Sequence, residues 1–242
     1  MKKRVLMRVS KIKFSSTRRA RWFGWMALTV AALCTGLPAQ AATDSETQIW
    51  TSATLQSDPS HASGVVGWLD LHARRGTGST VYILRPGIGY RLIQGVTGYV
   101  GYAYVPTALD GKADKIEHRT WQQFILQGNA AEGLTLMLRP RLEQRFGSGD
   151  DLGHRLRIMA RGTYTFSGLP LMLVLWNETF YQFNNTDWGL ASGFDQNRLF
   201  AGLGFPTASG PRFEVGFMNV FQNREPTDHS LNILAVNAFW TF

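Results

Sequence analysis

The feature that most constrains this chain is an alternation of apolar and polar residues that recurs from residue 47 to residue 242. No stretch of this region has a sustained 3.6-residue apolar period, so the pattern predicts strands and no helices. Gly, Pro, Asn or Asp separates eleven alternating segments of about 10–14 residues, and no repeat, low-complexity tract or linker interrupts them. We interpret residues 42–242 as one all-β domain with segments at 47–56, 63–75, 80–92, 97–106, 117–128, 134–146, 154–166, 169–183, 196–206, 211–222 and 229–242.

Residues 1–41 differ in composition and are predicted to be a signal peptide. They hold nine of the 25 basic residues and none of the 17 acidic ones. An apolar run at 22–37 follows the cationic stretch and leads into Pro38-Ala39-Gln40-Ala41, a small-x-small cleavage pattern. We therefore expect cleavage near Ala41. The alternative, a retained membrane anchor, is disfavoured because the apolar run contains glycines and ends in a breaker and a cleavage site.

Without this leader, the composition excludes several classes of function. The remaining 16 basic residues balance 17 acidic ones, so we expect no basic nucleic-acid-binding face. The one cysteine, Cys34, lies in the leader, which leaves no disulfide or thiol chemistry for the mature protein. Five scattered histidines without a spaced carboxylate cluster predict no metal site. The glycine pairs at 87–89 and 202–204 lack the following helix of a phosphate-binding loop, so no cofactor is expected.

Alternation alone does not show whether the apolar face points into a core or toward lipid. The segments match the roughly 9–11 residues that a tilted strand needs to cross a bilayer. The polar face carries Arg, Glu, Gln and Asn, whereas the two lysines beyond the leader, Lys112 and Lys115, share one connection. Short connections alternate with longer ones, as in barrels with short periplasmic turns and longer outer loops. Aromatic residues near strand ends, Trp50 among them, are typical of membrane interfaces. These features predict an antiparallel transmembrane β-barrel; the alternative is a soluble periplasmic lipocalin-like binding barrel with its apolar face inward.

The last alternating segment ends in an aromatic pair, Trp240 and Phe242, on its apolar face. This ending resembles the C-terminal signal by which bacterial outer-membrane barrels are recognised for insertion. We therefore expect Trp240 and Phe242 to act as an assembly signal read by the barrel-assembly machinery. The expected location is the outer membrane of a Gram-negative bacterium, where outer-membrane lipid surrounds a closed barrel that leaves no unpaired strand edge.

The number of strands is constrained by topology. If residue 242 is periplasmic, counting hairpins backwards leaves the segment 47–56 running toward the periplasm, although a cleaved N-terminus should start in the periplasm. Either one strand is hidden and the barrel has twelve, or 47–56 lies outside the wall and ten remain. A third possibility is that the N-terminus threads the lumen. Within this range of 10–12 strands we favour twelve.

The polar face predicts a lumen rich in arginine. On the alternation, twelve of the fourteen arginines beyond the leader point inward, against five carboxylates. Forked guanidinium–carboxylate pairs can fill a narrow interior and fix strand register. Alternatively, the surplus positive charge attracts anions such as phosphate, carboxylate or a lipid head group. The candidate network, which serves as a register site or a ligand site, comprises Arg139, Arg141, Glu143, Arg155, Arg157, Glu178, Arg198 and Glu214.

Several short motifs follow the predicted strands: Glu117-x-Arg119, Arg139-Pro140-Arg141-Leu142-Glu143, Arg155-x-Arg157, Trp176-x-Glu178-x-Phe180, Gln196-Asn197-Arg198 and Gly202-x-Gly204. Together they resemble a broad family of proteobacterial outer-membrane barrels that is catalogued as a domain of unknown function. The resemblance covers about residues 48–242. It implies a signal-peptided, secreted barrel and carries no activity with it.

We therefore expect a porin-like outer-membrane β-barrel. Its Arg-rich lumen is a passage or binding site for small anionic or amphipathic solutes, or the protein is a structural component of the envelope. The alternative from another class is an outer-membrane lipid-modifying hydrolase, although His229 and Ser230 are adjacent and so point to opposite faces of a strand. An open lumen favours transport, and a plugged lumen favours a structural or enzymatic role.

The leader generates the first testable prediction. The mature protein should begin at Ala42 and partition to the outer membrane, because the cationic and apolar stretches end in a cleavage site. Mass spectrometry of protein purified from the cell envelope checks the start. Retention of residues 1–41, or recovery of the protein in the soluble periplasmic fraction, would contradict the prediction.

Overall fold

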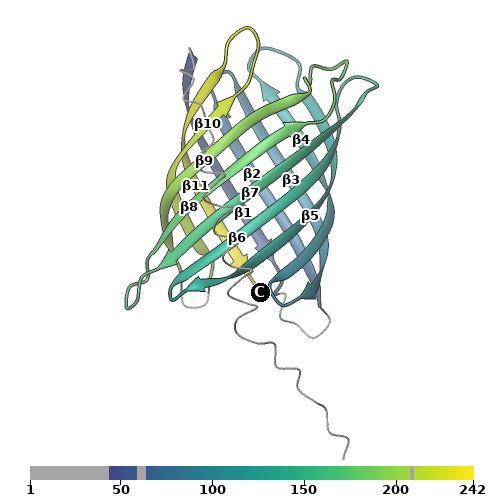
Figure 1. The fold of residues 1–242 in the computed structure, drawn as a ribbon. Helices are drawn as coiled ribbons and strands as arrows, with labels where there is room; N and C mark the ends of the chain where they lie inside the picture. Colours follow the sequence, from purple (N-terminus) through teal and green to yellow (C-terminus); the bar gives the residue numbers. More distant parts are fainter. Residues whose placement is uncertain (1–43, 59–63, 208–209) are drawn as a thin grey trace, which may run out of the picture.

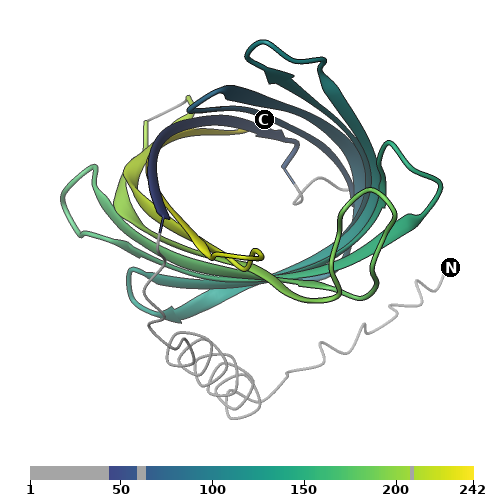
Figure 2. The same cartoon turned by 90° about the horizontal axis from the view of Figure 1, so that it is seen from above.

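Residues 44–58, 64–207 and 210–242 are described by a computed structural model (Figures 1 and 2). The predicted signal peptide and its cleavage site at Ala41 lie outside the described residues. Within the described part of the chain, no helix is long and apolar enough to cross a membrane.

The described residues form eleven β-strands that close into one barrel, and each predicted segment corresponds to one strand (Figures 1 and 2). The all-β barrel prediction is therefore confirmed. The strands are β1 (Asp44–Gln56), β2 (Val65–Gly76), β3 (Ser79–Ile93), β4 (Val96–Leu109), β5 (Lys115–Ala131), β6 (Leu134–Phe146), β7 (Leu152–Thr165), β8 (Met172–Gln182), β9 (Gly193–Phe205), β10 (Arg212–Gln222) and β11 (His229–Thr241).

The barrel closes through a parallel seam between β1 and β11, which runs from Asp44 beside His229 to Gln56 beside Thr241. The other ten neighbouring pairs are antiparallel. The preference for twelve strands was wrong, and so was the alternative that removes the first segment from the wall. Hairpin counting requires an even number only when every pair is antiparallel, and the parallel seam lifts that requirement.

The seam also defines the two ends of the barrel. We call the end at which β11 stops the C-terminal rim and the end at which β1 begins the N-terminal rim (Figure 1). The ten-residue β8–β9 connection lies on the N-terminal rim and the eight-residue β1–β2 connection lies on the C-terminal rim, so the predicted alternation of short and long connections holds only in part. The β3–β4 and β5–β6 turns of two residues lie on the C-terminal rim. Gly95 and Gly133 complete these two turns with φ of 81° and 71°, a left-handed conformation that glycine adopts without strain. The two-residue β2–β3 turn on the N-terminal rim breaks the alternation.

Side chains alternate between an apolar outer surface and a largely charged interior. Leu142 is 37% exposed on the outside, whereas the next residue, Glu143, is 1% exposed inside. This orientation is the reverse of the one that the lipocalin-like alternative requires. Other large apolar side chains exposed on the outer surface include Leu84, Ile88, Phe124, Leu173, Phe217 and Leu234.

Some polar side chains also face outward, and they are hydrogen-bonded to one another. Asn177 of β8 and Asn197 of β9 exchange amide hydrogen bonds of 2.9 and 3.1 Å, and Asn197 also donates to Thr179 at 2.9 Å. Gln122 of β5 and Gln144 of β6 form a second reciprocal pair, with both bonds at 3.1 Å. Because these amides are satisfied within the wall, they cost less on an apolar surface than isolated polar groups.

The interior also contains two apolar clusters that the sequence analysis did not predict. One lies on β8–β11 and includes Met172, Phe200 and Met218, and the other lies on β2–β5 around Trp121. They were missed because a single strand can place both apolar and charged residues on its inward face. Met172 and Glu178, for example, share the inward face of β8. The lumen therefore combines ion pairs with apolar packing.

The parallel seam generates the second prediction. Ala53 and Ala238 are register partners across it, so Ala53→Cys with Ala238→Cys should form a disulfide on mild oxidation, since paired strands bring the Cα atoms within bonding range. The matched control, Ala53→Cys with Leu234→Cys, is displaced by four residues and should not cross-link. Peptide mass spectrometry identifies the bridge. Cross-linking in the control alone would contradict the eleven-stranded register.

Candidate functional site

Two buried glutamates organise the interior of the barrel. Glu143 on β6 accepts hydrogen bonds from Arg155 at 2.6 Å and from Arg157 at 2.7 Å, both on β7. Glu178 on β8 accepts three hydrogen bonds from Arg157, at 2.9, 3.0 and 3.1 Å, and one from Arg139 at 3.1 Å. Arg157 therefore bridges both carboxylates. Charge-assisted, forked contacts of this kind link β6, β7 and β8 in one register.

The network continues toward the N-terminal rim. Arg155 also contacts Asp195 at 3.3 Å, and Arg224 from the β10–β11 connection contacts the other oxygen of Asp195 at 3.0 Å. Arg145 donates to Glu117 at 2.6 Å. Asp195 was not predicted as a member of the network. It is the extra residue of a β-bulge, because Phe180 and Tyr181 of β8 pair with residues 196 and 194.

Two smaller ion-pair groups complete the interior. Glu214, on β10, contacts Arg212 at 3.0 Å and also pairs with Arg161 from β7, which lies three strands away. Asp70 on β2 contacts Arg85 at 2.8 Å and His72 at 2.9 Å.

All eight predicted network residues lie in the lumen, but they do not form a single cluster. Arg139, Glu143, Arg155, Arg157 and Glu178 are joined by ion pairs, whereas Glu214 belongs to the separate group with Arg161 and Arg212. Arg141 donates to Gln123 at 2.8 Å and lies 3.8 Å from Glu143. Arg198 makes no ion pair within the described ranges. The predicted assembly residues, Trp240 and Phe242, are 49% and 63% exposed at the C-terminal rim, and their role stays a prediction.

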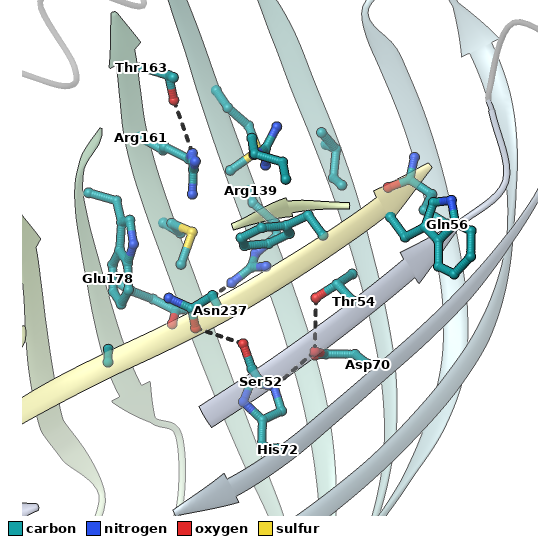
Figure 3. A pocket seen from close by; sticks show the side chains of 18 of the residues that line it. Ser52, Thr54, Gln56, Asp70, His72, Arg139, Arg161, Thr163, Glu178 and Asn237 are labelled. Carbon is teal, nitrogen blue, oxygen red and sulfur yellow. Dashed lines mark hydrogen bonds and ion pairs between the residues drawn. The ribbon is translucent and has the colours of Figure 1, made fainter. Parts of the chain in front are cut away.

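A cavity of about 640 Å³ occupies part of the lumen (Figure 3). Thr165, Gly210 and Thr241 line it at the C-terminal rim, and Arg157 and Arg198 line it deeper in the barrel. Arg141, Glu143 and Arg155 do not line it, and each is at most 5% exposed. The lumen is thus hollow toward the C-terminal rim and filled by the ion-pair network beyond. Seven arginines against two carboxylates line the cavity: Arg74, Arg85, Arg139, Arg157, Arg161, Arg198 and Arg212 against Asp70 and Glu178.

Two of these arginines lack a carboxylate partner in the part of the chain that the structure describes. The Arg74 guanidinium carbon lies 4.1 Å from the centroid of the Trp50 ring, and that of Arg198 lies 5.1 Å from the same ring. Both Nε atoms are buried without a hydrogen-bond partner. The site therefore holds two like charges beside one tryptophan. The Arg198 guanidinium carbon also lies 4.4 Å from the centroid of the Phe180 ring, and Arg198 donates to Gln196 at 3.3 Å.

Trp50 was interpreted as a membrane-interface residue, and that interpretation was wrong. It faces the lumen, because it shares its side of β1 with Ser52 and Thr54, which also line the cavity. The sequence carried a signal for this placement: the even-numbered positions of residues 48–56 are otherwise Gln, Ser and Thr, and the odd-numbered positions include Ile, Ala and Leu.

A serine, a histidine and an aspartate also meet at the cavity wall. Ser52 is the register partner of His72, and His72 contacts Asp70. The Ser52 hydroxyl, however, donates to Asn237 at 2.7 Å, and Nε2 of His72 faces Asp70 (Figure 3). No hydrogen bond of the described residues links the hydroxyl to the imidazole, as a nucleophile and its base require. No group of three or more His, Cys, Asp or Glu in the described ranges is placed to hold a metal ion.

Fold and site together define a closed eleven-stranded β-barrel with an ion-paired interior and an arginine-lined cavity. The family model described as "Protein of unknown function (DUF2490)" matches residues 47–230, and the chain belongs to this family. An uncharacterized protein of Methylorubrum extorquens is 32% identical over 229 residues, which cover 88% of this chain and 96% of the relative. The solved structure of LpxR from Salmonella typhimurium matches with a TM-score of 0.49 at 10% identity. This match covers 86% of this chain and 93% of the LpxR chain.

The ion-pair network generates the third prediction. Glu143→Ala should lower the free energy of unfolding by about 3–5 kcal/mol, because it leaves buried guanidiniums without their shared carboxylate. Asp150→Ala, in the exposed β6–β7 connection, should leave stability unchanged, since its carboxylate makes no ion pair within the described residues. Denaturant titration of the folded barrel in lipid vesicles measures both. Equal effects of the two substitutions would show that Glu143 does not hold the network together.

Proposed function

We propose that this protein is an outer-membrane β-barrel whose lumen cavity binds a small anionic solute. The observation that carries the proposal is a pair of guanidiniums beside Trp50, the half-buried Arg74 and the buried Arg198, that make no ion pair within the described residues. We also propose that the barrel lies in the outer membrane, that outer-membrane lipid surrounds it, and that the barrel-assembly machinery recognises its C-terminal strand.

The surface of the barrel supports the membrane location. Large apolar side chains are exposed on its outer face, while the charged side chains lie inside. A water-soluble barrel would gain nothing from exposing so much apolar surface, whereas lipid is a favourable environment for it. Closure of the sheet supports the same location, because every wall strand has a hydrogen-bonded neighbour on both sides.

Binding is better supported than passage. A continuous path would have to cross the layer that contains Glu143, Arg155 and Arg157, which are between 1% and 5% exposed. Opening that layer would separate buried ion pairs, and the loss of one partner from such a pair costs about 3–5 kcal/mol. We therefore propose a cavity that ends inside the barrel, with access from the C-terminal rim.

The charge of the cavity selects the ligand. A buried charge without a partner is costly, and a second like charge beside it adds to that cost. Arg139 and Arg157 contact Glu178 directly, whereas Arg74 and Arg198 make no ion pair within the described residues, although Glu178 is the register partner of Arg198. An anion bound beside both would supply the missing negative charge. No comparable arrangement in the described residues favours the hydrolase alternative.

The fourth prediction tests this site. Inorganic phosphate at constant ionic strength should stabilise the wild-type barrel against unfolding, by about 2.7 kcal/mol at a concentration of 100 times Kd. The double variant Arg74→Gln, Arg198→Gln should lose this response. Without phosphate it should be no less stable than the wild type, because two unpaired buried charges are gone.

Arg75→Gln is the matched control. Arg75 is adjacent to Arg74 but points outward, where it contacts Asp110 at 3.2 Å, so this variant should keep the wild-type response to phosphate. An equal phosphate response in the double variant and the wild type would contradict the proposed function.

A further inference from the structure

We propose that the ligand of the lumen cavity is an amphipathic anion, with one acid group carried on an aliphatic chain. This inference rests on the proposed anion site and adds the chemical class of the rest of the ligand. It stands on three features of the cavity: its methionines, its charge distribution and its size.

All four methionines beyond the leader line this one cavity, and they come from four different strands. They are Met137 on β6, Met159 on β7, Met172 on β8 and Met218 on β10. Methionine is unbranched, flexible and polarizable, so it forms apolar surfaces that adapt to ligands of varied shape. The outward faces of the strands use Leu, Ile, Val and aromatic residues instead. Beyond the leader, methionine is therefore confined to the cavity wall and is absent from the outer face of the described strands.

The arginines without an ion pair lie at one place in the cavity. Five of its seven arginines contact a carboxylate, and the remaining two lie beside Trp50, so a single acid group there can contact both. A ligand with several separated acid groups would meet no further unpaired arginine among the residues that line the cavity. The arginines that contact a carboxylate are Arg85 with Asp70, Arg139 and Arg157 with Glu178, and Arg161 and Arg212 with Glu214.

The acid site and the apolar wall are continuous. Trp50 carries the two unpaired guanidiniums on its ring, and it also packs against the β8–β11 apolar cluster that contains Met172 and Met218. An acid group beside Trp50 would thus place the attached chain against methionine. A cavity of about 640 Å³ is in the size range of sites for drug-sized ligands, and a bare phosphate ion would fill only a small part of it.

Native mass spectrometry of the intact barrel, released from detergent micelles, tests the inference. The probes are butanoate, octanoate and dodecanoate, with alkyl phosphates of the same chain lengths to separate a carboxylate source from a phosphate source. We expect affinity to rise at least tenfold from the shortest to the longest chain within one or both series. Met218→Gln should flatten this rise, and Met218→Leu should preserve it.

Phe217→Gln is the matched control for chains that attach to the outer surface. Phe217 precedes Met218 but is 55% exposed on the outside, so its substitution should not change the dependence on chain length. Equal affinity for all chain lengths, or a loss of chain-length dependence in Phe217→Gln rather than Met218→Gln, overturns the inference and leaves the anion site standing. If no anion of any length binds, the proposed function fails as well.

Discussion

The interior of this barrel depends on the pairing of guanidiniums with carboxylates in a space that water cannot fill freely. Arg157 lies between Glu143 and Glu178 and ties three consecutive strands together. Because side chains alternate with a period of two, a slip of one residue between strands would turn these charges toward the outside. In the membrane location that we propose, charges on the outer face would be costly. The ion pairs therefore select a single register, and the apolar clusters pack within it.

The same pairing explains where the barrel is hollow. Toward the N-terminal rim, carboxylates are supplied by Glu117, Glu143 and Asp195, and the side chains there are packed and largely buried. Around Trp50, Arg74 and Arg198 line the cavity without an ion-pair partner among the described residues. The lumen thus has two regions: a packed region in which ion pairs link the strands, and a cavity in which two arginines make no ion pair and which is the ligand site that we propose.

Much of this could be predicted from sequence, since a strict two-residue period assigns each residue to a face. The eleven segments and the inward placement of Arg155 and Arg157 follow from it directly. The strand number could not be predicted, because nothing within a strand reveals that its neighbour is parallel. The β-bulge hid Asp195, since alternation turns adjacent residues to opposite sides. Trp50 was misplaced because it was assigned to the membrane interface as an aromatic residue, whereas its position in the alternation of β1 places it on the lumen side.

The parallel seam has a consequence for how the chain could be rearranged. In a barrel built only of hairpins, the first and last strands meet with their free ends at one rim, and a short turn could join them. Here the end of β11 and the start of β1 lie at opposite rims, although the strands are neighbours along all 13 residues of β1. A linker from Thr241 to Asp44 would have to run the length of a strand, about 40 Å. Circular permutation, which hairpin barrels accept readily at their seam, would here need a connection that crosses the outer face or fills the cavity.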